Sequence, residues 1–277
     1  MNELFALLQR LLPQHAVSRL VGLLASTSNP LIRRAFIHGF ARAYGVDMSE
    51  AERPSLDDYR TFNDFFTRAL KPEARPLDPE PASLVSPADG VISQAGSLQG
   101  DRLLQAKGTS YSLRSLVGAG AERFHDGDFV TIYLAPRDYH RVHLPAAGTL
   151  TATTAIPGAL FSVNARTEAA VSDLFCRNER LVCRFETAHG GMLVVLVGAL
   201  IVASIDTVWG GPSSPYQREQ QHCWNQRFAK GAEIGRFLVG STVIVCCEPG
   251  RLRLDDATRR GRVVRMGQRL GSFVGGG

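Results

Sequence analysis

Residues 237–245 read FLVGSTVIV, an apolar run typical of a buried β-strand that Gly240, Ser241 and Thr242 interrupt at its middle. Glycine inside a strand weakens it and commonly marks a bulge or the close approach of another backbone. A purely structural explanation therefore exists. A chemical explanation requires partners for the serine elsewhere in the chain.

The composition is that of an ordinary soluble globular protein, because 44% of the 277 residues are hydrophobic and 21% are charged. A net charge of +5 permits an anionic partner without choosing between lipid and nucleic acid. The apolar run at residues 192–203 is shorter than the roughly 18 residues of a membrane span, so it predicts buried strands. The five cysteines are odd in number and lack a C-x-x-C pair, which favours a reducing compartment over a disulfide framework or a zinc site.

The N-terminal residues differ from the rest of the chain. Leucines at positions 4, 8, 11 and 12 recur at helical spacing, and similar patterns follow at 17–24 and 30–44. Residues 4–46 contain five arginines and no acidic residue. Such helices can lie in an anionic membrane interface, and they can equally form a cap packed on the main domain. We assign residues 1–60 to a helical region and leave these two alternatives open.

A turn-rich connector at residues 71–81 carries four prolines and marks a boundary. Beyond it, short β-like runs alternate with Gly, Pro and Asp turns; they lie at 91–95, 129–135, 181–185, 192–197, 200–205, 237–245 and 262–266. The sequence therefore predicts an α+β protein, with a mainly antiparallel β-rich catalytic domain at residues 61–277 and amphipathic helices before it.

Two stretches could supply partners for the serine. In SPADG, Asp89 lies in a tight turn before a strand, a place where Asp-Gly usually serves the turn alone. In YHRVHLP, His140 and His143 are three residues apart. A metal site would need a third ligand, and none stands at ligand spacing nearby. Imidazoles acting as general base or acid are the better hypothesis, with ordinary loop histidines as the alternative.

If Asp89 orients a histidine that deprotonates Ser241, the three residues have the logic of a charge-relay triad. A serine hydrolase usually presents its nucleophile on a G-x-S-x-G elbow, which this serine lacks. The nearest carbonyl is that of Gly240, and glycine tolerates the strained backbone that an attack on it requires. Attack would convert the peptide bond into an ester, elimination would release the upstream chain, and loss of ammonia would leave a pyruvoyl ketone.

These motifs closely resemble those of the bacterial phosphatidylserine decarboxylases, which are self-processing pyruvoyl enzymes. Besides SPADG, YHRVHLP and VGST, the stretches FNDFFTRALKP at 62–72, PGALFSVN at 157–164, NER at 178–180 and VGA at 197–199 look like the same family. The resemblance runs from about residue 60 to 250 with the motifs in the family's order. Val239 is a departure, because leucine is usual before Gly-Ser-Thr.

The resemblance implies that Asp89 and His143 form a charge relay with Ser241 that cuts the zymogen between Gly240 and Ser241. The products would be a large chain, 1–240, and a small chain, 241–277. His140 would transfer a proton during decarboxylation. Phosphatidylserine would form a Schiff base with the pyruvoyl group made from Ser241 and leave as phosphatidylethanolamine and CO2, without a metal or an external cofactor.

The same resemblance implies that residues 1–60 are a membrane-associating region. It also implies a peripheral protein on the cytoplasmic side of the cell membrane, in contact with an anionic lipid surface, and a homodimer. A nucleic-acid partner is disfavoured because the arginines are not interleaved with aromatics in one stripe. The alternative function is a serine hydrolase that uses Asp89, His143 and Ser241 on an intact chain.

Overall fold

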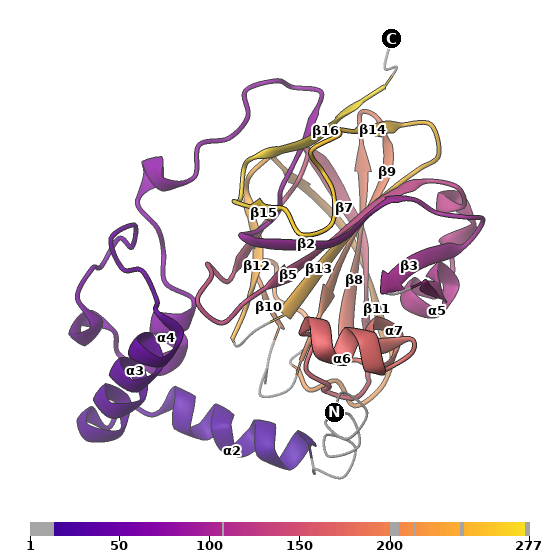
Figure 1. The fold of residues 1–277 in the computed structure, drawn as a ribbon. Coiled ribbons are helices and arrows are strands. Elements are labelled where there is room, and N and C mark those ends of the chain that lie inside the picture. The colour runs from indigo at the N-terminus through magenta and orange to yellow at the C-terminus, as the bar shows by residue number, and fades with distance from the viewer. Residues whose placement is uncertain (1–13, 107, 200–204, 213, 239–240, 275–277) are drawn as a thin grey trace.

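The computed structural model describes residues 14–106, 108–199, 205–212, 214–238 and 241–274. Within them the strands form a layered β body, and helices from the N-terminal end lie to one side of it (Figure 1). Neighbouring strands in the sheets pair antiparallel. The α+β class with mainly antiparallel sheets, expected from the sequence, is confirmed.

The largest sheet in the described part of the chain has eight strands. Their order is β11 (Gln220–Phe228), β7 (Gly148–Ile156), β8 (Arg180–Thr187), β9 (Gly190–Val197), β13 (Ser241–Cys247), β5 (Asp128–Leu134), β2 (Gly90–Ser97) and β15 (Val263–Val264). Strand β13 therefore lies inside this sheet, hydrogen-bonded to β9 on one side and β5 on the other.

Three smaller sheets complete the described β structure. They are β1 (Ser83–Val85), β16 (Arg269–Phe273) and β14 (Leu252–Leu254); β10 (Ile205–Thr207), β12 (Glu233–Phe237) and β6 (Arg141–His143); and the pair β3 (Arg102–Ala106) and β4 (Thr109–Ser112). The short helices here are α5 (Leu113–Val117), α6 (Ala165–Ala170), α7 (Leu174–Arg177) and the 3-10 turn η3 (Ala121–Phe124).

Each face of the large sheet covers a hydrophobic core. One core lies between the large sheet and strands such as β1, β6, β12 and β16, and the other lies under α5, α7 and the β3–β4 pair. Strand β13 contributes to both, because side chains alternate along a strand. Val243 and Val245 enter the first core, whereas Ile244 and Cys246 enter the second.

The prediction of one strand over residues 237–245 is wrong. Phe237 ends β12 in a three-stranded sheet, and Ser241 begins β13 in the eight-stranded sheet. The polar interruption in FLVGSTVIV is thus the place where the chain passes from one sheet to another. Residues 239–240, which include half of the expected cleavage site, lie outside the described residues.

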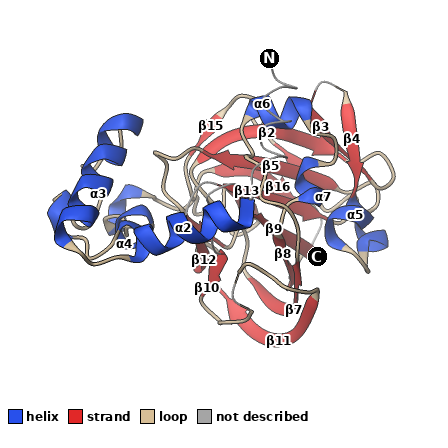
Figure 2. Cartoon of the chain, turned by 90° about the horizontal axis from the view of Figure 1, so that it is seen from below, coloured by secondary structure: helices blue, strands red, loops and turns tan. Residues whose placement is uncertain are grey.

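The N-terminal helices are α2 (Gln14–Ser26), α3 (Pro30–Tyr44) and α4 (Phe62–Phe66), with 3-10 turns η1 (Leu56–Asp58) and η2 (Pro72–Ala74). Figure 2 shows α3 and α4 beyond the edge of the strands, with α2 extending from them back toward the strands. The helix expected around the leucines at 4–12 lies outside the described residues, whereas the expected helix at 30–44 is confirmed as α3. No helix in the described part of the chain has both the length and the apolarity to cross a membrane.

Local chemistry sets the bounds of α3. The side chain of Asn29 accepts hydrogen bonds from the backbone N–H groups of Leu31 and Ile32, at 3.1 and 3.4 Å, and thereby caps the N-terminus. Gly45 ends the helix in the left-handed conformation, with φ of 62°. A residue without Cβ adopts this conformation at little cost, so the Gly at this position stops the helix.

A third hydrophobic cluster holds the helices together and continues past residue 60. It contains Ile37 from α3, Tyr59, and three phenylalanines of α4, all with at most 2% of their surface exposed; the phenylalanines are Phe62, Phe65 and Phe66. The division of the chain at residue 60 stays a prediction. The α4 helix packs with the N-terminal helices and, as described below, also touches the β body.

Two long strands were not predicted from the sequence. In β7, alternating threonines leave no continuous apolar run, and most residues of β11 are exposed or half-buried at the edge of the sheet. An edge strand needs little apolar character on either face, so its pairing with a neighbour is invisible to a search for hydrophobic patterns.

Candidate active site

Ser241 lies at the first position of β13, where it pairs with Leu134 at the end of β5. The serine is completely buried, and its Oγ has no hydrogen-bond partner within the described residues. A buried hydroxyl without a partner costs free energy, and most buried polar atoms in proteins avoid that cost. The unsatisfied Oγ of Ser241 is thus a feature that packing alone does not explain.

His140 lies in the connection from β5 to β6, close to the same place. Its Nε2 bonds the carbonyl oxygen of Ala135, 3.1 Å away, and Ala135 follows the cross-strand partner of Ser241. The ring stacks on Phe66 of α4, with centroids 4.0 Å apart. Because a carbonyl only accepts, Nε2 carries the proton, and Nδ1 is a bare acceptor with no partner in the described part of the chain.

Burial, and to a smaller extent the nearby positive charge of Arg68, together lower the pKa of His140 to about 3. The imidazole is therefore neutral at physiological pH. It can accept a proton at Nδ1 but cannot donate one until it has been protonated there.

His143, at the end of β6, is held at both ring nitrogens. Nδ1 donates to the carbonyl oxygen of Gly231 at 2.8 Å, and Nε2 accepts from the hydroxyl of Tyr139 at 2.9 Å. Burial also lowers the pKa of His143, against the opposing effect of its bond to Gly231. The second histidine is thus also neutral, with its proton on Nδ1 and its basic nitrogen on Nε2.

Asp89 lies in a turn directly before β2. The turn is fixed by the Ser86 hydroxyl, which donates to the carbonyl oxygen of Ala88 at 2.7 Å. Gly90 follows because a Cβ there would come within 2.3 Å of the carbonyl oxygen of Tyr133. The glycine of this Asp-Gly pair is therefore required by the close backbone approach and not only by the turn. The turn also directs the carboxylate of Asp89 into the protein.

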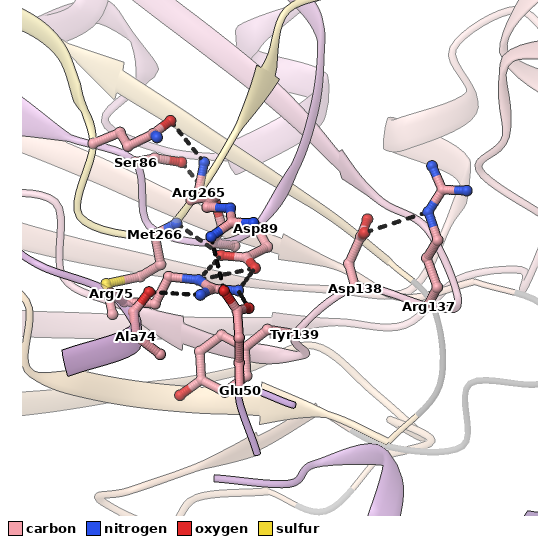
Figure 3. A network of polar contacts seen from close by, with 12 residues as sticks. Glu50, Ala74, Arg75, Ser86, Asp89, Arg137, Asp138, Tyr139, Arg265 and Met266 are labelled. Atoms are coloured by element: carbon pink, nitrogen blue, oxygen red, sulfur yellow. Dashed lines mark hydrogen bonds and ion pairs between the residues drawn. The ribbon is translucent and has the colours of Figure 1, made fainter. Parts of the chain in front are cut away.

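The carboxylate of Asp89 is held by a buried ion pair (Figure 3). Arg75 donates from Nε to Oδ1 at 2.8 Å and from Nη2 to Oδ2 at 2.5 Å, and the N–H of Met266 donates to Oδ1 at 2.8 Å. The same guanidinium contacts Glu50 at 2.9 Å, and Glu50 contacts Arg265 at 2.8 Å. These two carboxylates raise the pKa of Arg75 despite its burial, so the cation is permanent.

The structure brings the three predicted motifs together through the backbone. The N–H of His143 donates to the carbonyl oxygen of Pro87 in the Asp89 turn at 2.8 Å, and the N–H of Phe237 donates to the carbonyl oxygen of His140 at 3.0 Å. The negative charge of Asp89 also acts on His143 and favours its protonated form.

The side chains themselves are not joined. Within the described residues, no hydrogen bond links Asp89 to His143 or His143 to Ser241, because each is engaged elsewhere or has no partner. The hydrogen-bonded relay expected from the motifs is not assembled in this structure. Gly240, on the other side of the expected cleavage site, lies outside the described residues.

Several residues around this centre were not identified from the sequence, namely Arg68, Arg75, Glu50 and Met266. Arg75 lies in the proline-rich connector and Arg68 in FNDFFTRALKP, and both look like solvated surface in a basic chain. Their burial, 9% and 4% exposed, depends on contacts with distant segments and not on local pattern. Within the described residues, no three His, Cys, Asp or Glu side chains are grouped as a metal site would require.

The fold and the site define a β-rich protein with a buried serine at the start of a central strand, and with two neutral histidines on the chain segment that follows the neighbouring strand β5. Comparisons with known proteins narrow this class. The family model described as phosphatidylserine decarboxylase matches residues 62–272, and a second model, described as PSD, matches residues 4–45.

Individual relatives agree with the family models. Proteins named phosphatidylserine decarboxylase proenzyme from Bordetella avium (strain 197N) and Bordetella pertussis (strain Tohama I) are 51% and 52% identical over 97% of this chain and 94% of their own length. One from Acinetobacter baumannii (strain ACICU) is 49% identical over 99% of this chain and 97% of its own. The chain belongs to the phosphatidylserine decarboxylase family and is a carboxy-lyase.

Proposed function

We propose that the chain converts phosphatidylserine into phosphatidylethanolamine and CO2, and that it does so with a pyruvoyl group made from Ser241 by autocatalytic cleavage. The observation that carries the proposal is the buried Oγ of Ser241 at the first residue of β13, which has no hydrogen-bond partner within the described residues. The word proenzyme in the names of the relatives supports processing of a precursor. Membership in a carboxy-lyase family does not support the alternative of a serine hydrolase.

The surroundings of Ser241 fit a serine that is converted into a pyruvoyl group. A hydrolytic serine must be open to substrate and water, whereas this hydroxyl is 0% exposed in the intact chain. An internal hydroxyl can still attack the carbonyl that precedes it in the chain, since both belong to the same backbone. The unsatisfied Oγ is then the nucleophile of an intramolecular reaction, and its cost in stability is offset by function.

In this proposal His143 is the base for self-cleavage and Asp89 stabilises the imidazolium that forms. His143 is neutral and already has its proton on Nδ1, bound to Gly231, so Nε2 is available once it leaves the Tyr139 hydroxyl. For this step, Nε2 of His143 must exchange its hydrogen bond with the hydroxyl of Tyr139 for one with the hydroxyl of Ser241. The ester formed at Gly240 then loses the upstream chain, and hydrolysis with release of ammonia completes the group.

When in place, the pyruvoyl ketone condenses with the amine of the serine headgroup and takes up the electron pair released as CO2 leaves. His140 offers a place for a proton at Nδ1, which has no partner among the described residues, while Nε2 is fixed on Ala135. We propose that a proton passes through Nδ1 of His140 to the carbon that lost its carboxylate. The stacked ring of Phe66 holds the imidazole in place for this transfer.

We also propose a peripheral position on the cytoplasmic side of the cell membrane, with α2 and α3 against an anionic lipid surface. Leu20, Leu23 and Leu31 on these two helices are 61%, 72% and 82% exposed, and several exposed large apolar side chains on neighbouring elements are typical of an interaction surface. After cleavage the large and small chains stay together, because β13 lies between β9 and β5. A homodimer remains an expectation from the family.

The test is the intact mass of the purified protein under denaturing conditions. The parent is expected to give two species, one that ends at Gly240 and one that begins at position 241 and is lighter than the serine form by one ammonia. A Ser241→Ala variant, as the matched control, is expected to give a single species of the size of the full chain, 30.1 kDa. A single full-length species from folded parent protein would overturn the proposal.

A further inference from the structure

Arg68 is a buried cation whose hydrogen-bonding capacity is largely unused. It is 4% exposed, and its Nη2 donates to the carbonyl oxygens of Arg137 and Asp138 at 3.1 and 3.4 Å. Its Nε and Nη1 are closed off from solvent and have no partner among the described residues. No carboxylate in the described part of the chain forms an ion pair with it.

The other buried arginines show how unusual this is. Arg180 is equally buried, and all three of its nitrogens donate to backbone carbonyls at 2.6 to 3.0 Å. Arg75 donates to the carboxylates of Asp89 and Glu50.

Arg68 has no carboxylate partner among the described residues, and apart from the two carbonyl oxygens only the ring of Phe65, 5.7 Å from its Cζ, faces its charge. A buried charge with so little compensation is strongly unfavourable, and burial lowers the pKa of Arg68. Packing would be better served by an apolar side chain, so the guanidinium is retained for a partner that the described residues do not supply.

Arg68 lies beside the reaction centre. It follows Phe66, the ring that stacks on His140, by two residues, and its carbonyl partners belong to the connection that carries His140. Its charge acts on His140 directly. Ser241, His140 and the free N–H groups of Arg68 are all closed to solvent in this structure, so the headgroup must displace the residues that cover them.

We propose that Arg68 binds the phosphodiester of the lipid headgroup and thereby places the serine amine and carboxylate at the reaction centre. This inference rests on the proposed function. The substrate carries two anions, the phosphodiester and the carboxylate. A guanidinium paired with the carboxylate would stabilise the starting state more than the transition state, because that charge disperses as CO2 leaves. The phosphodiester keeps its charge throughout the reaction and suits a permanent cation.

The experiment compares Arg68→Met and Arg68→Lys with Arg114→Met, a control on α5 whose side chain is 69% exposed. For each variant the fraction of cut chain, the melting temperature, kcat and KM for phosphatidylserine in mixed micelles, and inhibition by phosphatidylethanolamine are measured. The product keeps the phosphodiester and lacks the carboxylate, so its inhibition constant distinguishes the two anions.

We expect Arg68→Met to be cut and to melt no lower than the parent. Its KM and the inhibition constant of phosphatidylethanolamine should rise together by roughly tenfold to a hundredfold, because a hydrogen bond to a charged group is lost. The change in kcat should be smaller. Arg68→Lys should recover part of this loss, and Arg114→Met should match the parent.

Three results would overturn the inference. One is unchanged KM in processed Arg68→Met. Another is a rise in KM with an unchanged inhibition constant for phosphatidylethanolamine, which would assign Arg68 to the carboxylate. The third is a lower melting temperature in both variants with unaltered kinetics of the processed fraction, which would make Arg68 a structural residue. A parent chain that is neither cut nor active would instead count against the proposed function.

Discussion

At the level of single residues, Arg75 holds the carboxylate of Asp89 in place. It gives the carboxylate a two-point contact, and its second carboxylate partner, Glu50, holds it from the other side. Without the guanidinium, Asp89 would be buried with only the N–H of Met266 as a donor. Removing one partner of a buried ion pair leaves the other charge uncompensated, so the placement of the carboxylate that acts on His143 would be weakened.

We expect Arg75→Ala to slow self-cleavage at least tenfold, and Arg75→Lys, which keeps the charge but not the fork, to slow it less. The fraction of uncut chain, followed over time on denaturing gels after synthesis in a cell-free system, measures the rate. Arg269→Ala is the control, because Arg269 makes an exposed pair with Asp255. Cleavage of Arg75→Ala at the parental rate would show that Asp89 does not depend on this contact.

His140 makes the stability of the fold depend on pH. Its pKa is about 3 when folded and 6.5 in the reference state, so below pH 6.5 the unfolded chain binds a proton that the folded chain does not. Stability contributed by the neutral ring is thus complete above pH 6.5 and falls as the pH decreases toward 3. The free energy of unfolding should fall by about 1.4 kcal/mol per pH unit from this residue alone.

Urea unfolding between pH 7.5 and 5, in a Ser241→Ala background that keeps the chain uncut, measures this slope. The variant His140→Phe cannot be protonated and should keep the stack on Phe66. Its slope should be smaller by about 1.4 kcal/mol per pH unit. Equal slopes in the two proteins would mean that His140 is not held neutral by burial.

Sequence reasoning at this scale identified Asp89, His140, His143 and Ser241 from their motifs, but not the contacts among them. Nothing in SPADG indicates that its carboxylate meets an arginine from the proline-rich connector, because that meeting depends on chain segments brought together by the fold. The same limit applies to Tyr139, whose hydroxyl occupies the basic nitrogen of His143.

At the level of elements, β13 is the strand on which both cores depend. Ile244 is completely buried at the middle of β13 and faces the second core, with Val195 of β9 and Thr131 of β5 as its cross-strand partners. Truncating such a residue removes contacts on both sides of a central strand and leaves a cavity.

Ile244→Ala is expected to lower the free energy of unfolding by about 2–5 kcal/mol in the uncut Ser241→Ala background. Val263→Ala, on the edge strand β15 where the side chain is 70% exposed, should change it by less than about 0.5 kcal/mol. Chemical denaturation of the two variants against their parent gives both numbers. A loss below 1 kcal/mol for Ile244→Ala would contradict the central place of β13.

The apolar runs of the central strands were sufficient to predict β5, β8 and β9, because strands buried on both faces show continuous hydrophobic sequence. Strand β2, whose residues alternate between buried and half-buried, was also predicted. The same signal merged β12 and β13 into one strand. Two strands in different sheets are both apolar here, and only the tertiary structure shows that the glycine between them belongs to a change of sheet.

At the level of the whole molecule, the α+β architecture followed from the contrast between the arginine-rich N-terminal helices and the β-rich remainder. Whether those helices cap the β body or lie on lipid could not be decided from amphipathicity. The structure shows a contact of α4 with the β body, and the lipid contact stays a prediction. Phe66 of α4 packs against the centre of the β body, whereas Leu20, Leu23 and Leu31 of α2 and α3 are left exposed.

We expect the protein to bind vesicles that contain anionic phosphatidylglycerol, and the double variant Leu23→Asp, Leu31→Asp to bind at least tenfold more weakly. Binding of the parent should weaken as salt rises, because exposed arginines contribute to it. Vesicle co-sedimentation measures both effects. Leu104→Asp, on β3 and 44% exposed, is the control and should bind like the parent. Equal binding of all three proteins would exclude this face from the lipid contact.

The contact between Met266 and Asp89 joins residues from the two sides of the expected cut. Strand β13 must also be seated between β5 and β9 before Ser241 stands beside the histidine-bearing connection. Under the proposed chemistry, a chain that has not completed its fold has no means of cutting itself. A cut chain is then one that has completed its fold. The uncut fraction in a cell therefore measures the molecules that did not complete folding.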